Sequence, residues 1–200
     1  AYKQLGHIYR TRGLKESAAD YYRKAIGFIE ENNLSKFSLP ILYSELATVL
    51  IDTGRYEEAA EELEKGKARL TLPEYIWPLK LKQVILYSRT GRSAEARTLF
   101  DRIRQGHGGY LTTASLTEAQ LAIDLAEHEF GKALATLDKL IGLFKETGHS
   151  ETYFYKLFQT RAEAYAETGN YEAAYKSQKH YLDLYRKKVG DDNERTLGEF

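Results

Sequence analysis

The residues of this chain that could carry metal chemistry are five histidines, at positions 7, 107, 128, 149 and 180. None belongs to the pair of His residues four apart, with an intervening Glu, that a helical metal-hydrolase site needs. The segment Ala126-Glu127-His128-Glu129 is rich in potential ligands. Successive residues of a helix point in different directions, however, so these side chains cannot converge on one ion. We expect His128 instead to occupy a turn that tolerates left-handed backbone geometry.

Two further segments resemble chemical motifs only superficially. Gly106-His107-Gly108-Gly109 lacks the Lys-Ser/Thr pair and the preceding strand of a phosphate-binding loop, which favours a flexible loop between repeats. The carboxylates at 57–58 and 61–62 share a predicted helix with Lys65 and Lys67, which suits surface ion pairs better than acid–base catalysis. The chain has no Cys, which excludes disulfides, thiolate zinc sites and thiol nucleophiles. We therefore expect no catalytic residues, no cofactor and no metal.

The composition favours an all-α protein. Only three Pro occur in 200 residues, and residues that favour helices are abundant. The 29 basic and 29 acidic residues balance, so no overall field recruits nucleic acid or an anionic membrane. No apolar run is long enough to span a bilayer, and the start lacks the core of a signal peptide. We expect a cytoplasmic location, with a periplasmic one left open, and a chain cut from something larger.

An internal repeat organises these residues. A turn residue recurs at Gly13, Gly54, Gly91, His128 and Gly169, at intervals of 41, 37, 37 and 41 residues. Five residues after each turn stands an Ala, at positions 18, 59, 96, 133 and 174. Nine residues after it stands a large side chain in four of the five units, and Gln178 is the exception. This pattern predicts five pairs of helices in which a small residue allows close helix crossing.

The first unit carries a specific family resemblance. Its segment Leu5-Gly6-His7-Ile8-Tyr9, followed by Gly13, Ala18, Tyr22 and Ala25, resembles the tetratricopeptide repeat. The resemblance covers about residues 1–186, and it is poor in the fourth unit, where Asp124 replaces a recurring Tyr or Leu. It implies a right-handed α-solenoid of about five helix-turn-helix repeats that binds a protein or peptide on its concave surface.

The repeat pattern also predicts the domain organisation. An array over 1–188 would contain units at about 1–33, 38–72, 74–108, 112–148 and 151–188. We predict paired helices near 1–12 and 15–32, 38–53 and 56–70, 74–90 and 93–105, 112–128 and 130–147, and 151–168 and 171–188. Val189-Gly190-Asp191-Asp192-Asn193 interrupts the periodicity, so 189–200 would be a capping helix or the start of a connector to a missing domain.

The residues predicted to line the groove lie about ten, six, three and two positions before each turn, on one face of each first helix. The predicted partner-binding residues are Lys3, His7, Arg10, Ser44, Thr48, Asp52, Leu81, Ile85, Ser88, Arg89, Glu118 and Ala122. The same rule adds Gln159, Glu163, Ala166 and Glu167 in the fifth unit. Their charge changes from basic at the N-terminal end to apolar and then acidic, which predicts a peptide with an apolar anchor and acidic residues near Lys3 and Arg10. A merely solvated face is the alternative.

Some tetratricopeptide-repeat proteins grip the terminal carboxylate of chaperone tails with a Lys and Asn set. Lys3 matches in place, but His7 and Glu45 stand where Asn would be expected. The resemblance therefore does not carry this function to the chain.

Aromatic residues form one dense cluster, Tyr153, Phe154, Tyr155 and Phe158, which is either core or a hydrophobic anchor site. For Trp77 we favour packing at a helix start. The leading hypothesis is a non-enzymatic interaction or sensory module of a larger, bacterial signalling protein. Its last unit resembles the closing repeat of such proteins. The alternatives are the effector-binding region of a transcription regulator and a purely structural scaffold, and self-association stays open.

Overall fold

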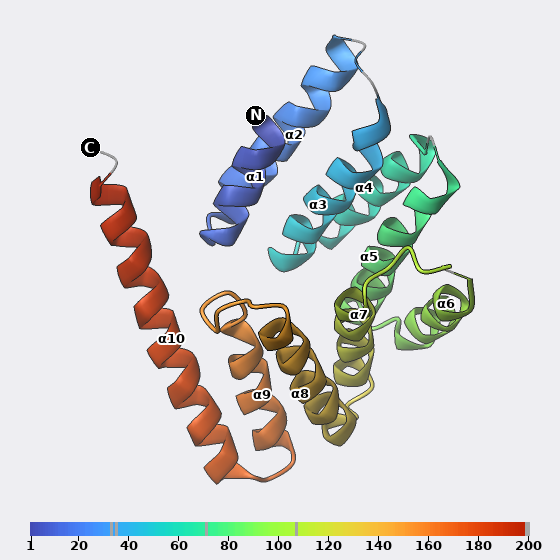
Figure 1. Cartoon of the computed structure of the whole chain (residues 1–200). Coiled ribbons are helices and arrows are strands. Elements are labelled where there is room, and N and C mark those ends of the chain that lie inside the picture. The colour runs from blue at the N-terminus through green and yellow to red at the C-terminus, as the bar shows by residue number, and fades with distance from the viewer. Residues whose placement is uncertain (33, 35, 71, 107, 199–200) are drawn as a thin grey trace. The chain divides into compact units, whose positions relative to one another are not determined.

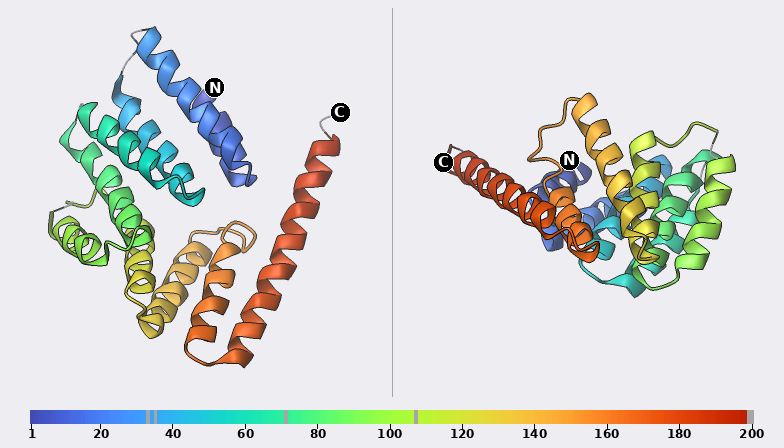
Figure 2. Two further views of the ribbon diagram at one scale, coloured as in Figure 1. Left: turned by 180° about the vertical axis from the view of Figure 1, so that it is seen from behind. Right: turned by 90° about the horizontal axis from the view of Figure 1, so that it is seen from below.

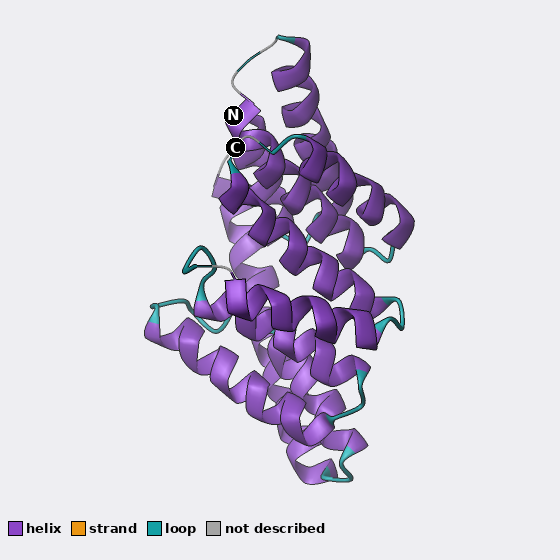
Figure 3. Cartoon of the chain, turned by 90° about the vertical axis from the view of Figure 1, so that its right-hand side faces the viewer, coloured by secondary structure: helices purple, strands orange, loops and turns teal. Residues whose placement is uncertain are grey.

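The protein is described by a computed structural model that covers residues 1–32, 34, 36–70, 72–106 and 108–198. Within these residues the chain forms ten α-helices and two short 3₁₀ turns, and contains no strand (Figures 1 and 3). The all-α class and the stacked helix pairs are confirmed. Internal contacts divide the chain into two compact units, residues 1–126 and 127–200.

At each of the five turn positions found in the sequence, one helix ends and the next begins. Gly13, Gly54, Gly91 and Gly169 all have φ between 75° and 80°. His128, at φ 57°, has the single positive φ among the non-Gly residues that the structure describes. The residue after each Gly closes the preceding helix, as where the Leu14 N–H donates to the Tyr9 carbonyl at 2.9 Å. The prediction of a left-handed turn at His128 is confirmed.

Residues 1–126 form seven helices in two layers. Their bounds are α1 Tyr2–Thr11, α2 Lys15–Glu31, α3 Leu39–Asp52, α4 Tyr56–Ala68, α5 Ile76–Arg89, α6 Ser93–Gly106 and α7 Thr113–Ala126. The first helices α3, α5 and α7 pack one against the next, whereas α2, α4 and α6 each pack between their own first helix and the following one. One core cluster joins α1 to α5, and a second joins α5, α6 and α7.

Small residues allow the close helix crossings that the sequence predicted. Ala18, Ala59 and Ala96 have no exposed surface. A Cβ added at Gly6 would lie 2.7 Å from the ring of Tyr22, so α1 can approach α2 because position 6 has no side chain. Trp77 packs at the start of α5, where its ring lies 3.1 Å from a Cβ added at Gly106. This agrees with packing at a helix start.

Residues 127–200 form three helices, α8 Phe130–Glu146, α9 Lys156–Glu167 and α10 Tyr171–Gly198. In Figure 2, α9 lies between α8 and α10, and the contacts agree with this order. Phe154 and Phe158 are buried together with Ile141, while Tyr153 is half exposed. The ring of Phe144 stacks on Phe154 with centroids 5.5 Å apart. The dense aromatic cluster is therefore largely core.

The structure differs from the predicted helix bounds at two places in this unit. Residues 151–155 form turns, with the Tyr153 N–H donating to the Ser150 carbonyl at 2.9 Å, so α9 begins at Lys156 rather than near 151. α10 continues to Gly198 through 189–193, where we predicted an interruption. The physical reason is that Gly190 and Asn193 each weaken a helix by about 1 kcal/mol or less, whereas Pro would remove a hydrogen bond.

Several predictions about loops fall partly on residues that the structure does not describe. Asn33 and Ser35 of the predicted end of the first unit, His107 of the glycine-rich segment and residues 199–200 of the predicted connector lie outside the described residues. The predicted boundaries of the five repeats stay predictions.

Candidate binding surface on the first helices of residues 1–126

The first helices of residues 1–126 carry charged side chains that lie close to one another although they come from four different repeats. The Nη2 atom of Arg10 on α1 lies 3.6 Å from Oε2 of Glu45 on α3, which joins the first two repeats. Glu118 on α7 lies close enough to Arg10, Glu45, Asp52 and Lys82 for their charges to act on its carboxyl group. We call these five residues the charged cluster.

Within the charged cluster, burial of the Glu118 carboxyl is the largest influence on its pKa. Burial raises the pKa of the Glu118 carboxyl above its ordinary value, because the ionised form loses hydration. The positive charges of Lys82 and Arg10 oppose this rise in pKa, whereas the negative charges of Asp52 and Glu45 add to it. The carboxyl of Glu118 therefore accepts a proton more readily than an exposed Glu does, and it responds to the charge of anything that binds beside it.

Tyr22 of α2 links the charged cluster to the core beneath it. Tyr22 is 1% exposed. Burial is the main cause that raises the pKa of its hydroxyl, and the nearby negative charge of Glu45 adds to this rise. The positive charge of Arg10 opposes it and lowers the pKa. Because Gly6 leaves space for this ring, the hydroxyl reaches the neighbourhood of the Arg10–Glu45 pair. The small residue predicted to permit helix crossing thus also positions Tyr22 under the surface.

The predicted groove residues divide by exposure. Exposed or partly exposed are Lys3, His7, Arg10, Thr48, Asp52, Ile85, Arg89, Glu118 and Ala122. Ser44, Leu81 and Ser88 are at most 7% exposed, so the expectation that they face the groove is corrected. The reason is that α3, α5 and α7 pack directly on one another, and Leu81 joins the core cluster that contains Ile123 of α7.

Hydroxyl groups near this surface are largely used by the backbone. The Ser88 hydroxyl donates to the Val84 carbonyl at 3.0 Å, and the Thr48 hydroxyl donates to the Ser44 carbonyl at 2.9 Å. His7 lies beside Arg10, with Nδ1 3.5 Å from its Nη2. The charged side chains, rather than the hydroxyls, are therefore the groups that remain able to recognise a ligand.

Two members of the charged cluster were missing from the predicted site, Glu45 and Lys82. Glu45 stands nine residues before the turn at Gly54, and Lys82 stands nine residues before the turn at Gly91. The groove rule did not include the ninth position before a turn. The sequence held the signal, since a charged residue recurs at this spacing in consecutive units. On an α-helix the positions nine and ten before the turn point in directions about 100° apart. On α3 and α5 position nine, Glu45 and Lys82, is partly exposed, while position ten, Ser44 and Leu81, is buried.

Asp124, the residue that disagreed with the repeat pattern, is 1% exposed on α7. Gln120 Nε2 donates to its Oδ1 at 2.6 Å, and Arg97 Nη2 of α6 lies 3.9 Å from the same oxygen. A buried carboxylate needs such partners, because an unpaired one costs several kcal/mol. Asp124 therefore takes part in joining α6 to α7, in the place where other units use an apolar or Tyr side chain.

In residues 127–200 the predicted groove positions lie on α9. Glu163 and Glu167 are exposed, and Gln159 Nε2 donates to Glu163 Oε1 at 3.3 Å. These residues present an acidic face within their own unit. The charge gradient predicted along the whole chain stays a prediction.

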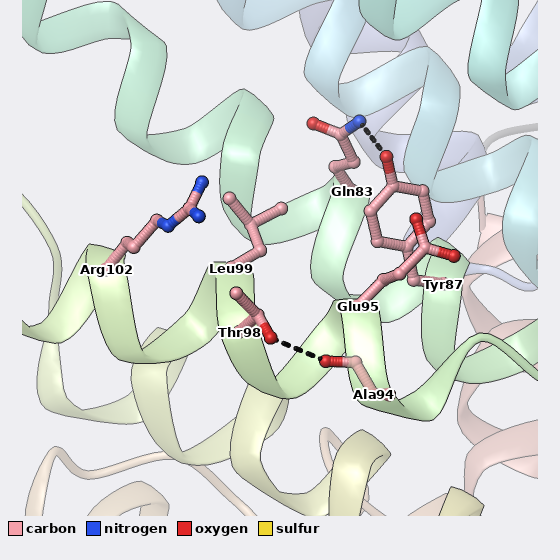
Figure 4. Close-up of a pocket in the computed structure, with 7 residues that line it drawn as sticks. All are labelled: Gln83, Tyr87, Ala94, Glu95, Thr98, Leu99 and Arg102. Atoms are coloured by element: carbon pink, nitrogen blue, oxygen red, sulfur yellow. Dashed lines mark hydrogen bonds between the residues drawn. The ribbon is translucent and has the colours of Figure 1, made fainter.

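A surface pocket of about 430 Å³ lies over α5 and α6, lined by Gln83, Tyr87, Ala94, Glu95, Thr98, Leu99 and Arg102 (Figure 4). Gln83 Nε2 donates to the Tyr87 hydroxyl at 2.6 Å. Arg92 stacks on the Tyr87 ring at 4.0 Å and also pairs with Glu95 at 2.6 Å. These polar groups of the pocket therefore pair with one another.

One of the predicted surface ion pairs of α4 is present, with Lys65 Nζ 2.8 Å from Glu62. Lys67 pairs instead with Glu64 at 2.7 Å, and Glu58 pairs at 2.6 Å with Arg55, directly before α4. Among the residues that the structure describes, no group of three or more His, Asp or Glu side chains is placed to hold a metal ion. No helix in that part of the chain is both long enough and apolar enough to cross a membrane.

Comparison with known proteins agrees with the stacked-helix architecture of the chain. Sequence profiles of the tetratricopeptide repeat match residues 1–32, 40–65 and 81–102. No curated protein shows a significant sequence match to the chain. Three solved structures show the fold. PlcR of Bacillus thuringiensis, solved with the peptide PapR7 and DNA, has a TM-score of 0.69 and 13% identity over 96% of this chain and 72% of that chain.

The other two structures are more distant. BtubC from P. vanneervenii has a TM-score of 0.54 and 17% identity over 93% of this chain and 79% of that chain. A putative kinesin light chain of Podosopora anserina with TPR-like repeats has a TM-score of 0.52 and 19% identity over 93% of this chain and 94% of that chain. The recurring positive-φ turns, the buried Ala residues and the profile matches show tetratricopeptide repeats in the matched part of the chain, residues 1–32, 40–65 and 81–102.

Proposed function

We propose that residues 1–126 bind a peptide segment of a partner protein on the face of their first helices, as the interaction or sensory module of a bacterial signalling protein. The observation that carries the proposal is the charged cluster, which brings together side chains of α1, α3, α5 and α7. A structural scaffold has no need of charged groups gathered from four repeats beside a desolvated carboxyl. A non-enzymatic role fits the pocket over α5 and α6, whose polar groups pair with one another.

The chemistry of the cluster refines the peptide expected there. Glu45 partly neutralises Arg10, so Lys3 is the better partner for an acidic side chain of the peptide. The buried Leu81 cannot serve as the apolar anchor that the sequence suggested, which leaves Ile85 and the smaller Ala122. Glu118 and Asp52 favour a peptide group that donates hydrogen bonds or carries positive charge. The ligand in this proposal is therefore a peptide of mixed charge.

A second candidate is the effector-binding region of a transcription regulator. It is favoured by the similarity to PlcR, which covers 96% of this chain and whose structure contains a peptide and DNA. Both candidates use a bound peptide, and they differ in what the binding controls.

A peptide selection tests the proposed function. Peptides selected from a random displayed library against the full chain would be measured by fluorescence anisotropy on the wild type and on Lys82→Glu. We expect the charge reversal to weaken binding about tenfold, since a partly desolvated charge pair contributes about 1.5–3 kcal/mol. Arg104→Glu, an exposed reversal on α6, is the matched control and should leave binding unchanged. Equal affinity for all three proteins would contradict the proposal and favour a scaffold.

A further inference from the structure

One face of α10 exposes a row of apolar side chains outside the proposed peptide site. The exposed apolar residues are Tyr171, Tyr175, Leu182, Tyr185 and Val189. Together with the polar Gln178, which lies between Tyr175 and Leu182, they follow one another at alternating spacings of four and three residues. Their exposed fractions run from 39% at Leu182 to 73% at Tyr171. We call this row the α10 seam. Such spacing places side chains on one face of a helix and is typical of a face that packs against another helix.

The repeat register shows what covers the equivalent face in residues 1–126. Gly13 and Gly169 occupy the same turn position, so each residue of α10 corresponds to the residue 156 positions earlier in α2. Tyr175 and Leu182 thereby correspond to Ala19 and Ile26, which are 1% and 7% exposed in the core cluster that joins α2 to α3. The α10 seam therefore corresponds to the surface on which α2 receives the next helix of the array.

Charges beside the α10 seam indicate what kind of helix would fit. Lys179 and Arg186 lie seven residues apart along its solvent side, and both are exposed. Their equivalents on α2 are Arg23 and Glu30. Arg23 pairs with Glu58 of α4 at 3.4 Å, and Glu30 pairs with Arg69, directly after α4, at 3.1 Å. These positions therefore form ion pairs with the following repeat. On α10 both positions are basic, so the complementary groups are carboxylates.

We propose that the α10 seam is a docking surface for an acidic amphipathic helix of a partner protein. The apolar stripe of that helix covers Tyr175, Leu182 and Tyr185 as α3 covers the corresponding residues of α2. Its carboxylates face Lys179 and Arg186. Basic flanks then add specificity and attraction to an interface whose area is mainly apolar.

A second copy of the chain fits this surface less well. Two α10 seams placed face to face in register would bring Lys179 and Arg186 of one copy near the same residues of the other, and like charges oppose such pairing. Asp183, the carboxylate between them, already lies 3.9 Å from Arg186 of its own copy. The first helix of a second copy offers no carboxylate either, because residues 1–15 contain no Asp or Glu. The charge pattern therefore favours a different, acidic partner.

Two synthetic peptides test the proposal on the full chain. Both are helices of about 18 residues with Leu at alternating three- and four-residue spacing, and they differ only in having Glu or Lys beside the apolar stripe. Circular dichroism confirms that both are helical, and fluorescence anisotropy measures binding. We expect the Glu peptide to bind about tenfold more tightly than the Lys peptide, since opposite charges beside an apolar interface attract and like charges repel.

Variants assign that binding to the α10 seam. Tyr175→Glu with Leu182→Glu should weaken binding of the Glu peptide about tenfold or more, because burying a carboxylate against the stripe is costly. Lys179→Glu with Arg186→Glu should reverse the preference between the two peptides. Tyr110→Glu, at a Tyr that is 61% exposed in residues 1–126, is the matched control and should have no effect. Lys82→Glu should also leave this binding unchanged, which separates it from the proposed peptide site.

Three results would overturn the proposal. The first is equal binding of both peptides or of neither, and the second is a Tyr175→Glu, Leu182→Glu double variant that binds as the wild type does. The third is a molar mass that rises with concentration in light scattering and stays constant in the Leu182→Glu variant. That outcome would assign the α10 seam to a second copy of the chain.

Discussion

The helices α2 and α10 occupy the same place in the repeat and show opposite burial. Ile26 of α2 is 7% exposed, while Leu182, its equivalent in α10, is 39% exposed. The residues are alike in size and polarity, and both follow a Gly turn by the same distance. What differs is the following helix, since α3 packs on α2, whereas the helix that packs on α10 within residues 127–200 is the preceding one, α9.

This difference shows that burial in a repeat array depends on the neighbouring repeat more than on the residue itself. Each helix pair leaves an apolar face that only the next pair can cover. Tyr175 is 70% exposed where α2 has the small Ala19, so α10 presents more apolar surface than the helix it resembles. Contiguous exposed apolar faces commonly mark interaction sites.

The largest expected effect tests the comparison directly with Ile26→Ala and Leu182→Ala. Ile26→Ala should lower the free energy of unfolding by about 2–5 kcal/mol, because it leaves a cavity in the core between α2 and α3. Leu182→Ala should lower it by about 0.5 kcal/mol or less, since the side chain is exposed and loses little packing. Urea denaturation followed by circular dichroism measures both values.

The α10 variant is the control for the loss of a branched apolar residue from a helix. Equal destabilisation by the two substitutions would mean that Leu182 is covered in solution. The description of the α10 seam as exposed would then be wrong.

The sequence was sufficient to predict the features that depend on local geometry. Gly at a fixed spacing marks a positive-φ turn wherever it occurs, and the five turns were found because so few other residues tolerate that backbone. Ala18 and Ala59 were predicted at helix crossings for a similar reason, since nothing larger fits there. Such features can be read from a single repeat.

Features that depend on the neighbouring repeat were harder to predict. Leu81 and Ser88 were expected on the groove, but the packing of α5 on α7 buries them, and the extent of that packing depends on both helices. Lys82 was missed because helix rotation decides whether position nine or ten before the turn faces the groove. The coupling of Glu118 to Arg10 joins residues more than a hundred positions apart, which no local spacing indicates.

A smaller effect is expected at the glycines, where close packing in one unit contrasts with open space in the other. Gly6→Ala should destabilise the chain by about 1–3 kcal/mol, because its Cβ would lie 2.7 Å from the buried ring of Tyr22. Gly142→Ala in α8 meets nothing within 4 Å and should stabilise by about 0.5–1 kcal/mol through higher helix propensity. Thermal unfolding of the two variants gives the signs. A stabilising Gly6→Ala would show that α1 crosses α2 less closely than the structure indicates.

The smallest effect concerns two carboxyls whose pKa values shift in opposite directions. Burial raises the pKa of Glu118, whereas hydrogen bonding to Lys145, at 2.7 Å, lowers the pKa of Glu151 despite its partial burial, and His180 at 3.0 Å adds to this. A raised folded-state pKa means that the native state binds more protons, so the Glu118 contribution to stability falls as the pH rises above the ordinary value of 4.5. A lowered folded-state pKa means that the native state binds fewer protons, so stability changes with pH in the opposite direction. The Glu151 contribution to stability is therefore present above pH 4.5 and is lost as the pH falls through its lowered pKa.

Denaturation measured from about pH 2 to pH 8 separates these two contributions. Glu118→Gln should flatten the loss of stability as the pH rises above 4.5, because the neutral amide has no proton to release. Glu151→Gln should cost about 1 kcal/mol or less at pH 7, since the pair with Lys145 is partly exposed, and the cost should vanish at low pH. If Glu118→Gln instead lost stability at neutral pH, ionised Glu118 would be a net stabilising partner of Lys82 and Arg10. The charged cluster would then be a structural ion-pair network rather than a surface held ready for a ligand.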